Sequence, residues 1–290
     1  MKHFDLYNEL IRIITRDTQY IGFGESVNNG SFIGGLARQA DNLDMELINL
    51  PNNEYSHVGY LYGLSLSGVN SILFVKQVDF LLLAMDQLHF TSEILKTQEQ
   101  SGKFLILAVL QDQGMQGPHS SFRRISDFLR LVNFPSYYLN APVLPDKFKL
   151  QGFPSQAFSM IVASQRLLQS NLVTDGYYVE SFKDSVVISD VENSDRTEFN
   201  ILVDGFCYDI VLDRLKQKGK KSFRVIIPCV SGFDRKEFID RYKVNFIVDD
   251  VMNDEYNLVD KNHITVLRTK KTLHTSIFSL DEMYSILNFN

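Results

Sequence analysis

The sequence contains little cysteine and no long apolar run. Cys207 and Cys229 are the only cysteines among 290 residues, too few for a disulfide framework and typical of buried free thiols in a reducing compartment. No stretch of about 18 consecutive apolar residues occurs, and residues 1–5 enter a mixed polar and apolar segment unlike a signal peptide. We therefore expect a cytoplasmic protein without a membrane span.

Positive charge is not in excess either. Lys and Arg total 29 against 35 Asp and Glu, for a formal net charge of −6. Such a balance gives no general attraction to nucleic acid or to an anionic membrane, so neither is expected as a partner. With 44% hydrophobic residues, the chain is long enough to bury a substantial core, and its length favours two domains.

The first half of the chain alternates between two kinds of apolar pattern. Helical spacing and short continuous apolar runs follow one another, and this alternation predicts a parallel sheet covered by helices. Helices are expected at residues 6–14, 59–68, 79–95, 121–131 and 155–169, and strands at 20–24, 46–50, 71–75 and 103–110. A proline-punctuated stretch, 135–154, separates the last two predicted helices.

The second half predicts a smaller α/β unit. Residues 175–197 are polar and acidic and indicate a linker or hairpin between domains. Strands are then expected at 199–203, 223–230 and 244–248, and helices at 207–218 and 234–242. We predict a first domain at 1–172, a linker at 173–197 and a second domain at 198–290, with no solenoid repeat and no low-complexity segment.

Four landmarks follow one another in the first domain. Each alone is weak, but their order and spacing are jointly specific. They are Gly24-Glu25-Ser26 with a Gly-rich stretch at 30–35; Pro51-Asn52-Asn53-Glu54 leading into Gly59-Tyr60-Leu61-Tyr62-Gly63; Asp79-Phe80 followed by Ala84-Met85-Asp86-Gln87; and Pro118-His119-Ser120 in a Gly-rich loop. Over nearly its whole length, the chain resembles the β subunit of thiamine-diphosphate-dependent 2-oxo acid dehydrogenases.

The resemblance implies a fold and an activity. The fold would be α/β, with two three-layer domains built on mostly parallel sheets: a thiamine diphosphate pyrimidine-binding domain, then a smaller transketolase C-terminal-like domain. The chain would belong to an oxidoreductase that decarboxylates a 2-oxo acid with thiamine diphosphate and transfers the resulting acyl or aldehyde unit.

Two residues would be catalytic by this resemblance. Glu54 would hydrogen-bond a ring nitrogen of the aminopyrimidine and so promote removal of the thiazolium proton. The alternative for Glu54 is a helix N-terminal carboxylate that offsets the helix dipole. His119 would lie near the reacting centre and orient or protonate the substrate or intermediate. The alternative for His119 is a solvated loop histidine.

Two further residues would bind the cofactor. Glu25 would face the cofactor cavity, or else be an exposed turn carboxylate. Phe80 would pack beside the aminopyrimidine, or else fill the core. The chain departs from the family pattern at Val78, where an aromatic residue is common, and at Ser121-Phe122-Arg123, where glutamine and an acidic residue usually follow.

The motif Gly-Asp-Gly is absent from the sequence. In the family, this motif and a later Asn hold the diphosphate through Mg²⁺. No metal ligands are therefore expected in this chain. The resemblance implies an α subunit that carries the diphosphate-binding domain and most of the Mg²⁺ site, in an α2β2 heterotetramer with two-fold symmetry. A lipoyl acyltransferase would be a further partner.

Two other functions remain open. The chain could be the C-terminal subunit of a split transketolase-like enzyme, because Gln116-Gly117-Pro118-His119 is also close to that family. It could instead be a non-catalytic assembly partner, which Val78 and the compact second domain would suit. Glu54 argues against this last alternative, because a carboxylate in an apolar cleft is costly.

Overall fold

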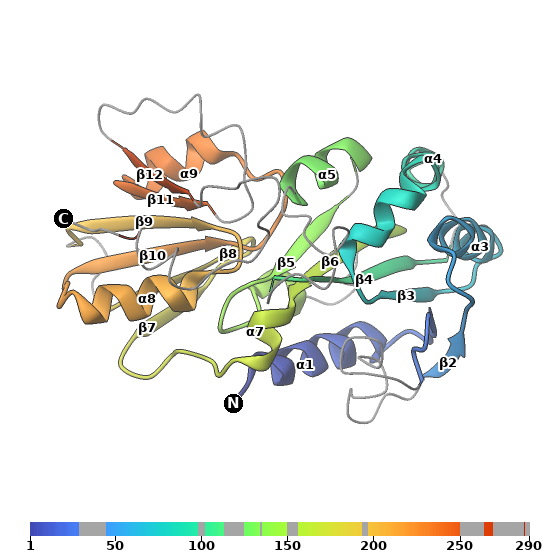
Figure 1. The fold of residues 1–290 in the computed structure, drawn as a ribbon, viewed down its shortest axis with the longest axis horizontal. Helices are drawn as coiled ribbons and strands as arrows, with labels where there is room; N and C mark the ends of the chain where they lie inside the picture. Colours follow the sequence, from blue (N-terminus) through green and yellow to red (C-terminus); the bar gives the residue numbers. More distant parts are fainter. Residues whose placement is uncertain are drawn as a thin grey trace.

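The computed structural model describes residues 1–28, 45–97, 102–112, 125–133, 135–149, 156–192, 197–249 and 264–268, together with Leu287. Two six-stranded sheets, both mostly parallel, lie end to end (Figure 1). The protein therefore has an α/β fold with one sheet in each half, as the sequence predicted.

The first sheet is parallel throughout, in the order β2-β1-β3-β4-β6-β5. Every residue of β3, β4 and β6 is buried, as expected for central parallel strands covered on both faces. The strands are β1 (Ile21–Gly24), β2 (Glu46–Asn49), β3 (Ser71–Val75), β4 (Phe104–Leu110), β5 (Ser136–Leu139) and β6 (Phe158–Ser164).

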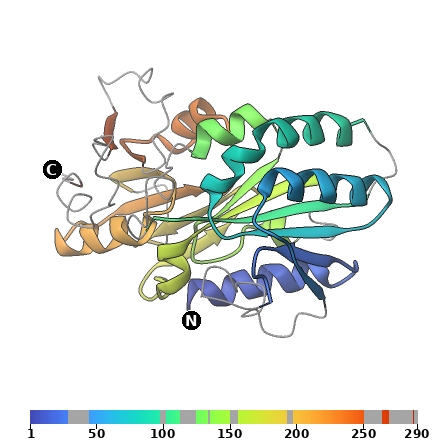
Figure 2. The ribbon, with the colours of Figure 1, turned by 45° about the vertical axis from the view of Figure 1, so that its right-hand side comes forward.

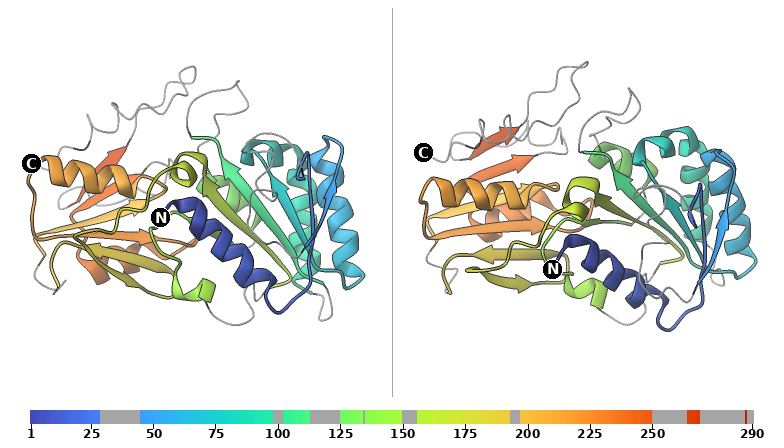
Figure 3. Two further views of the ribbon diagram at one scale, coloured as in Figure 1. Left: turned by 90° about the horizontal axis from the view of Figure 1, so that it is seen from below. Right: turned by 60° about the horizontal axis from the view of Figure 1, so that its bottom comes forward.

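Helices cover both faces of this sheet. One face carries α3 (Glu54–Leu66), the 3₁₀ helix η1 (Val78–Ala84), α4 (Met85–Leu95) and α5 (Ile125–Val132) (Figure 2). The other face carries α1 (His3–Thr15), α6 (Asp146–Lys149) and α7 (Gln165–Gln169) (Figure 3). Leu6, Leu10 and Ile14 recur on the buried side of α1 and pack against the sheet.

One sequence prediction in this domain was wrong. Residues 155–169 were expected to form a helix, but most of this stretch is the strand β6, and only α7 is helical. A short apolar run such as 158–164 is compatible with either a buried strand or a buried helix, and periodicity alone does not separate them. The strand β5 also lies inside the proline-punctuated stretch, where no strand was expected.

The second sheet has the order β12-β11-β9-β10-β8-β7. Its four strands β9 to β12 are parallel to one another, and β7 and β8 add an antiparallel hairpin at one edge. The strands are β7 (Tyr178–Ser181), β8 (Ser185–Ser189), β9 (Phe199–Asp204), β10 (Phe223–Pro228), β11 (Phe246–Asp249) and β12 (Thr265–Arg268). The stretch 173–197, expected as a linker or hairpin, thus contributes two strands to this sheet.

Two helices cover opposite faces of the second sheet. Ile201 and Val203 of β9 pack in one apolar cluster with α8 (Tyr208–Gln217). Leu202, between them, packs in another cluster with α9 (Arg235–Tyr242). This alternation follows from the two-residue period of a strand.

A single apolar core joins the two halves. The cluster under α3 and α4 continues through Tyr138 and Phe206 to the α8 face of the second sheet. The ring centroids of Tyr138 and Phe206 are 5.4 Å apart. This packing places the carboxyl ends of β5 and β6 against those of β9 and β10.

Two expectations from composition can be compared with the structure. Cys207 and Cys229 are both free and buried, which confirms that prediction. Burial raises the pKa of the Cys229 thiol well above its usual range, so this thiol stays protonated. Within the described part of the chain, no helix has the length and apolar character needed to cross a membrane.

Candidate functional site

The carboxyl edge of the first sheet contains a topological switch point between β1 and β3. After β1 the chain adds β2 on one side, and it then adds β3 on the other side of β1. The segments that leave β1 and β3 therefore run in opposite directions. In open α/β sheets, ligands bind in the crevice outside the strand ends at such a point.

Glu25 and Phe80 are brought together at this switch point by Lys76. Glu25 is the first residue after β1, and Lys76 is the first after β3. The Lys76 Nζ lies 2.6 Å from the Glu25 Oε2, and 29% of the lysine side chain and 26% of the glutamate side chain are exposed. The same Nζ lies 5.9 Å from the ring centroid of Phe80, within the range of a weak cation–π contact.

Lys76 was not predicted as a site residue. The available signal was its place, since a cation that directly follows a buried strand of a parallel sheet lies at the edge where ligands bind. Glu25 is half-buried in an ion pair and is not the exposed turn carboxylate of the alternative interpretation. Phe80 is half-buried, so it is not a fully buried core residue.

Glu54 is the first residue of α3 and is only 6% exposed. The N-cap Asn53 begins the helix, because its side chain accepts a hydrogen bond from the Ser56 N–H at 3.1 Å. The buried His57 donates its Nε2–H to the Pro51 carbonyl and holds the preceding loop against the helix. Glu54 is therefore held on an ordered turn and has little contact with water.

The turn that carries Glu54 is attached to the strand end that carries Glu25. The Leu50 N–H donates to the Gly24 carbonyl, with an N···O distance of 3.0 Å. Gly24 ends β1 and directly precedes Glu25. Glu54 and Glu25 thus belong to the same edge of the sheet, joined through one backbone hydrogen bond.

His119 lies outside the described residues, as do 113–124 as a whole. Its predicted role near the reacting centre remains a prediction. Asp112, the last described residue before this segment, is 8% exposed. Its carboxylate accepts hydrogen bonds from the Ser164 hydroxyl at 2.5 Å and the Arg166 N–H at 2.9 Å.

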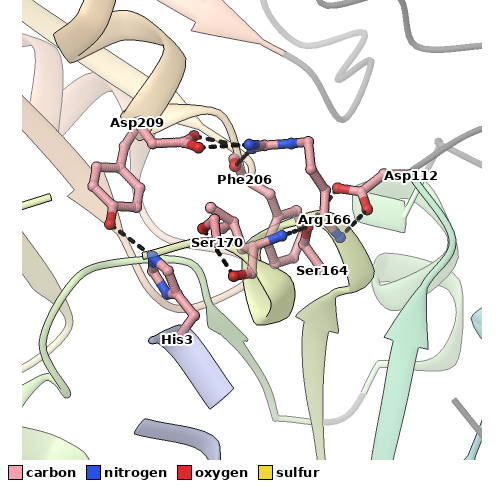
Figure 4. A network of polar contacts seen from close by, with 9 residues as sticks. His3, Asp112, Ser164, Arg166, Ser170, Phe206 and Asp209 are labelled. Carbon is pink, nitrogen blue, oxygen red and sulfur yellow. Dashed lines mark hydrogen bonds and ion pairs between the residues drawn. The ribbon is translucent and has the colours of Figure 1, made fainter. Parts of the chain in front are cut away.

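A polar network closes the other end of the same edge (Figure 4). The Arg166 guanidinium donates to both Asp209 carboxylate oxygens, at 2.6 and 3.0 Å, and to the Phe206 carbonyl at 2.5 Å. Only 11% of the Arg166 side chain and 15% of the Asp209 side chain are exposed. Asn140, after β5, donates to the carbonyls of Gly205 and Pro228. These contacts join the carboxyl ends of the two sheets.

Electrostatics at this junction favour fixed protonation states. Burial disfavours the charged form of Arg166, but the ion pair with Asp209 outweighs this and leaves the arginine pKa above its ordinary value. His3, hydrogen-bonded to the Tyr208 hydroxyl at 2.7 Å, is 1% exposed. Burial lowers the pKa of His3 to about 4; the nearby Asp209 partly opposes this shift and Arg166 adds to it. His3 is therefore neutral at pH 7.

Two cavities among the described residues lie away from the predicted site. One, of about 880 Å³, lies between residues 170–177 and α8; the other, of about 540 Å³, lies between the start of β5 and the turn after β10. Neither is lined by Glu25, Glu54 or Phe80. The residues predicted to bind a cofactor thus lie at an edge of the sheet outside both cavities.

Comparison with known proteins adds no relative. No model of a known protein family matches the sequence, and no curated protein matches it. The function must therefore be inferred from the sequence landmarks and the geometry of the sheet edge.

Proposed function

We propose that this chain is the β-type subunit of a thiamine-diphosphate-dependent enzyme that decarboxylates a 2-oxo acid and transfers the resulting acyl or aldehyde unit. The observation that carries the proposal is the buried carboxyl group of Glu54, 6% exposed, beside the switch point of a parallel sheet. A carboxyl group with so little access to water needs polar partners. A ring nitrogen of a bound aminopyrimidine would be one.

The residues at this edge fit the pyrimidine half of the cofactor. Glu54 would hold the ring nitrogen and move its proton, Phe80 would contact the ring, and Glu25 would line the cavity. When bound, thiamine diphosphate supplies the carbanion-stabilising chemistry that decarboxylation of a 2-oxo acid requires. The chain's own contribution is orientation and proton transfer at the pyrimidine.

The diphosphate half is assigned to a partner chain. Over the described ranges, no three His, Cys, Asp or Glu side chains gather to hold a metal ion, and the full sequence has no Gly-Asp-Gly. Magnesium and the diphosphate require oxygen ligands, which an α subunit would supply. The proposed assembly is an α2β2 heterotetramer, with a lipoyl acyltransferase as one acceptor of the acyl unit.

An exposed apolar surface next to Glu54 supports such a partner. It is formed by α3, η1 and α4, and we call it the α3–α4 face (Figure 2). Its large apolar side chains are between 43% and 71% exposed: Tyr55, Tyr60, Leu82, Leu83 and Phe90. A contiguous apolar surface of this kind marks an interaction site. Gly63, on the same helix, has open space where a Cβ would be, so a partner helix could approach closely.

The first test is native mass spectrometry of the tagged chain purified from its own host. The proposal expects a stoichiometric second protein with a Gly-Asp-Gly motif, together with bound thiamine diphosphate and magnesium. A bare homo-oligomer without cofactor would favour the non-catalytic assembly partner. Turnover of sugar phosphates but of no 2-oxo acid would favour the split transketolase-like enzyme.

The second test is Glu54→Gln in the purified complex. Loss of the proton-transfer group is expected to lower kcat about 10²- to 10⁴-fold, with the complex still assembled. The matched control is Glu237→Gln, in the first turn of α9 of the second domain, which should leave turnover unchanged. Normal turnover of the Glu54 variant would remove the proposed mechanism.

A further inference from the structure

We propose that Lys76 binds the carboxylate of the 2-oxo acid substrate and so determines the preference for an anionic substrate. This inference rests on the proposed function and names a residue that the sequence landmarks did not include. It concerns substrate recognition at the same edge of the sheet.

The backbone holds Lys76 firmly beside Glu25. Gly24 and Phe74 are directly paired in β1 and β3. A Cβ placed on Gly24 would lie 2.5 Å from the Phe74 carbonyl oxygen, so only glycine permits this approach of the two strands. The residues that follow the two strands, Glu25 and Lys76, are therefore presented side by side at the switch point, and their side chains meet at 2.6 Å.

The charges at this edge require a cation if the substrate is an anion. Glu25 and Glu54 both contribute carboxyl groups, which would repel the carboxylate of a 2-oxo acid. Lys76 supplies the opposite charge next to Glu25. Its pairing with Glu25 orients the ammonium, and this orientation lowers the entropic cost of binding a second carboxylate.

The ammonium also has the capacity for a second anion. A lysine side chain carries three N–H donors, and the 2.6 Å contact with Glu25 Oε2 engages one. The side chain is 29% exposed, so its ammonium is reachable from outside the sheet. The ring of Phe80, 5.9 Å from Nζ, would fix the direction of the lysine side chain toward the predicted pyrimidine pocket.

The experiment uses the complete complex with its partner and cofactor, and compares wild type with Lys76→Met. The probes are pyruvate, 2-oxobutanoate and 2-oxo-4-methylpentanoate as substrates, and the methyl ester of the best of them as an uncharged competitive inhibitor. Lys76→Met should raise KM for the acid roughly 10- to 100-fold, the effect of losing a hydrogen bond to a charged group. The inhibition constant of the ester should stay within about twofold, because the ester carries no negative charge.

Two further variants separate recognition from folding. Lys76→Arg keeps the positive charge and should recover most of the affinity for the acid. Lys96→Met removes a lysine that pairs with Glu93 at 2.8 Å on α4, away from the switch point, and should leave both constants unchanged.

The outcomes are distinct. An unchanged KM in an active Lys76→Met complex, or equal weakening of acid and ester, would overturn the role of Lys76 while the proposed function stands. A wild-type complex that holds no thiamine diphosphate and consumes none of the three acids would overturn the proposed function, and with it this inference.

Discussion

The two ends of the carboxyl edge of the first sheet differ in how they are covered. At β5 and β6, the chain's own second sheet covers the edge, and Arg166, Asp209 and Asn140 are hydrogen-bonded across the junction. At β1 and β3, the ion pair of Glu25 and Lys76 is about one quarter exposed, beside the exposed α3–α4 face. The protein completes one end by itself, and we infer that a partner chain completes the other.

This difference has a physical basis. Polar groups at the junction are desolvated, so each needs a partner within the protein, and the network of Figure 4 supplies such partners. Polar groups at the other end keep contact with water and can exchange that water for a ligand. Burial of apolar surface would then drive association of the α3–α4 face with the partner.

The largest stability effect is expected from opening the closed end. Arg166→Met would leave Asp209 buried without its guanidinium partner. Removing one member of a buried pair costs about 3–5 kcal/mol of unfolding free energy, measurable by chemical denaturation. The exposed pair of Lys96 and Glu93 provides the contrast, since Lys96→Met should cost less than about 1 kcal/mol. Equal losses from the two variants would mean that the junction is not a special site of stability.

The next largest effect is expected at the open end. Tyr60→Ser combined with Leu83→Ser would remove two large side chains, 54% and 71% exposed, from the α3–α4 face. The isolated chain should keep its unfolding free energy, because these side chains are not in its core. Affinity for the partner should fall about a hundredfold, or roughly 2.8 kcal/mol. The change can be read by titrating the two purified chains, and undiminished affinity would place the interface elsewhere.

The smallest effect is expected from acidification. The pKa of His3 is lowered to about 4 in the folded chain, so below pH 6.5 the unfolded state binds more protons at this residue. The stability due to neutral His3 is therefore complete above pH 6.5 and is lost as the pH falls toward 4, a loss of roughly 2 kcal/mol.

His3→Gln tests this pH dependence because it removes the titrating group at the hydrogen bond to Tyr208. Unfolding free energies measured between pH 7 and pH 4 should decline less steeply in the variant than in wild type. If the two chains decline in parallel, other groups dominate the acid sensitivity of the junction.

Several elements could be predicted from local sequence patterns. The strand β3 has the predicted bounds, and β4 differs from its prediction by one residue, because both are continuous apolar runs bordered by polar residues. Helices α8 and α9 also fall within their predicted stretches. Residues 158–164 were misassigned as helical because an apolar run of this length suits either structure when it is buried on all sides.

The candidate site could be predicted only in part. Glu54 and Glu25 were named because they stand in ordered landmarks, and the structure places both at one edge of the sheet. Lys76 was missed because its significance depends on β1 and β3 being neighbours, 50 residues apart in register from Ile21 to Ser71. The role of His119 stays a prediction.

The sequence by itself determined the α/β class, the buried thiols and the residues of the landmarks, because these depend on composition and on patterns within a few residues of one another. Only the tertiary structure decided the order of the strands, the junction between the two sheets and the ion pair of Lys76 with Glu25. Strand pairing joins residues far apart in the chain, and many pairings satisfy the same apolar pattern. The choice among them depends on how all the layers pack together.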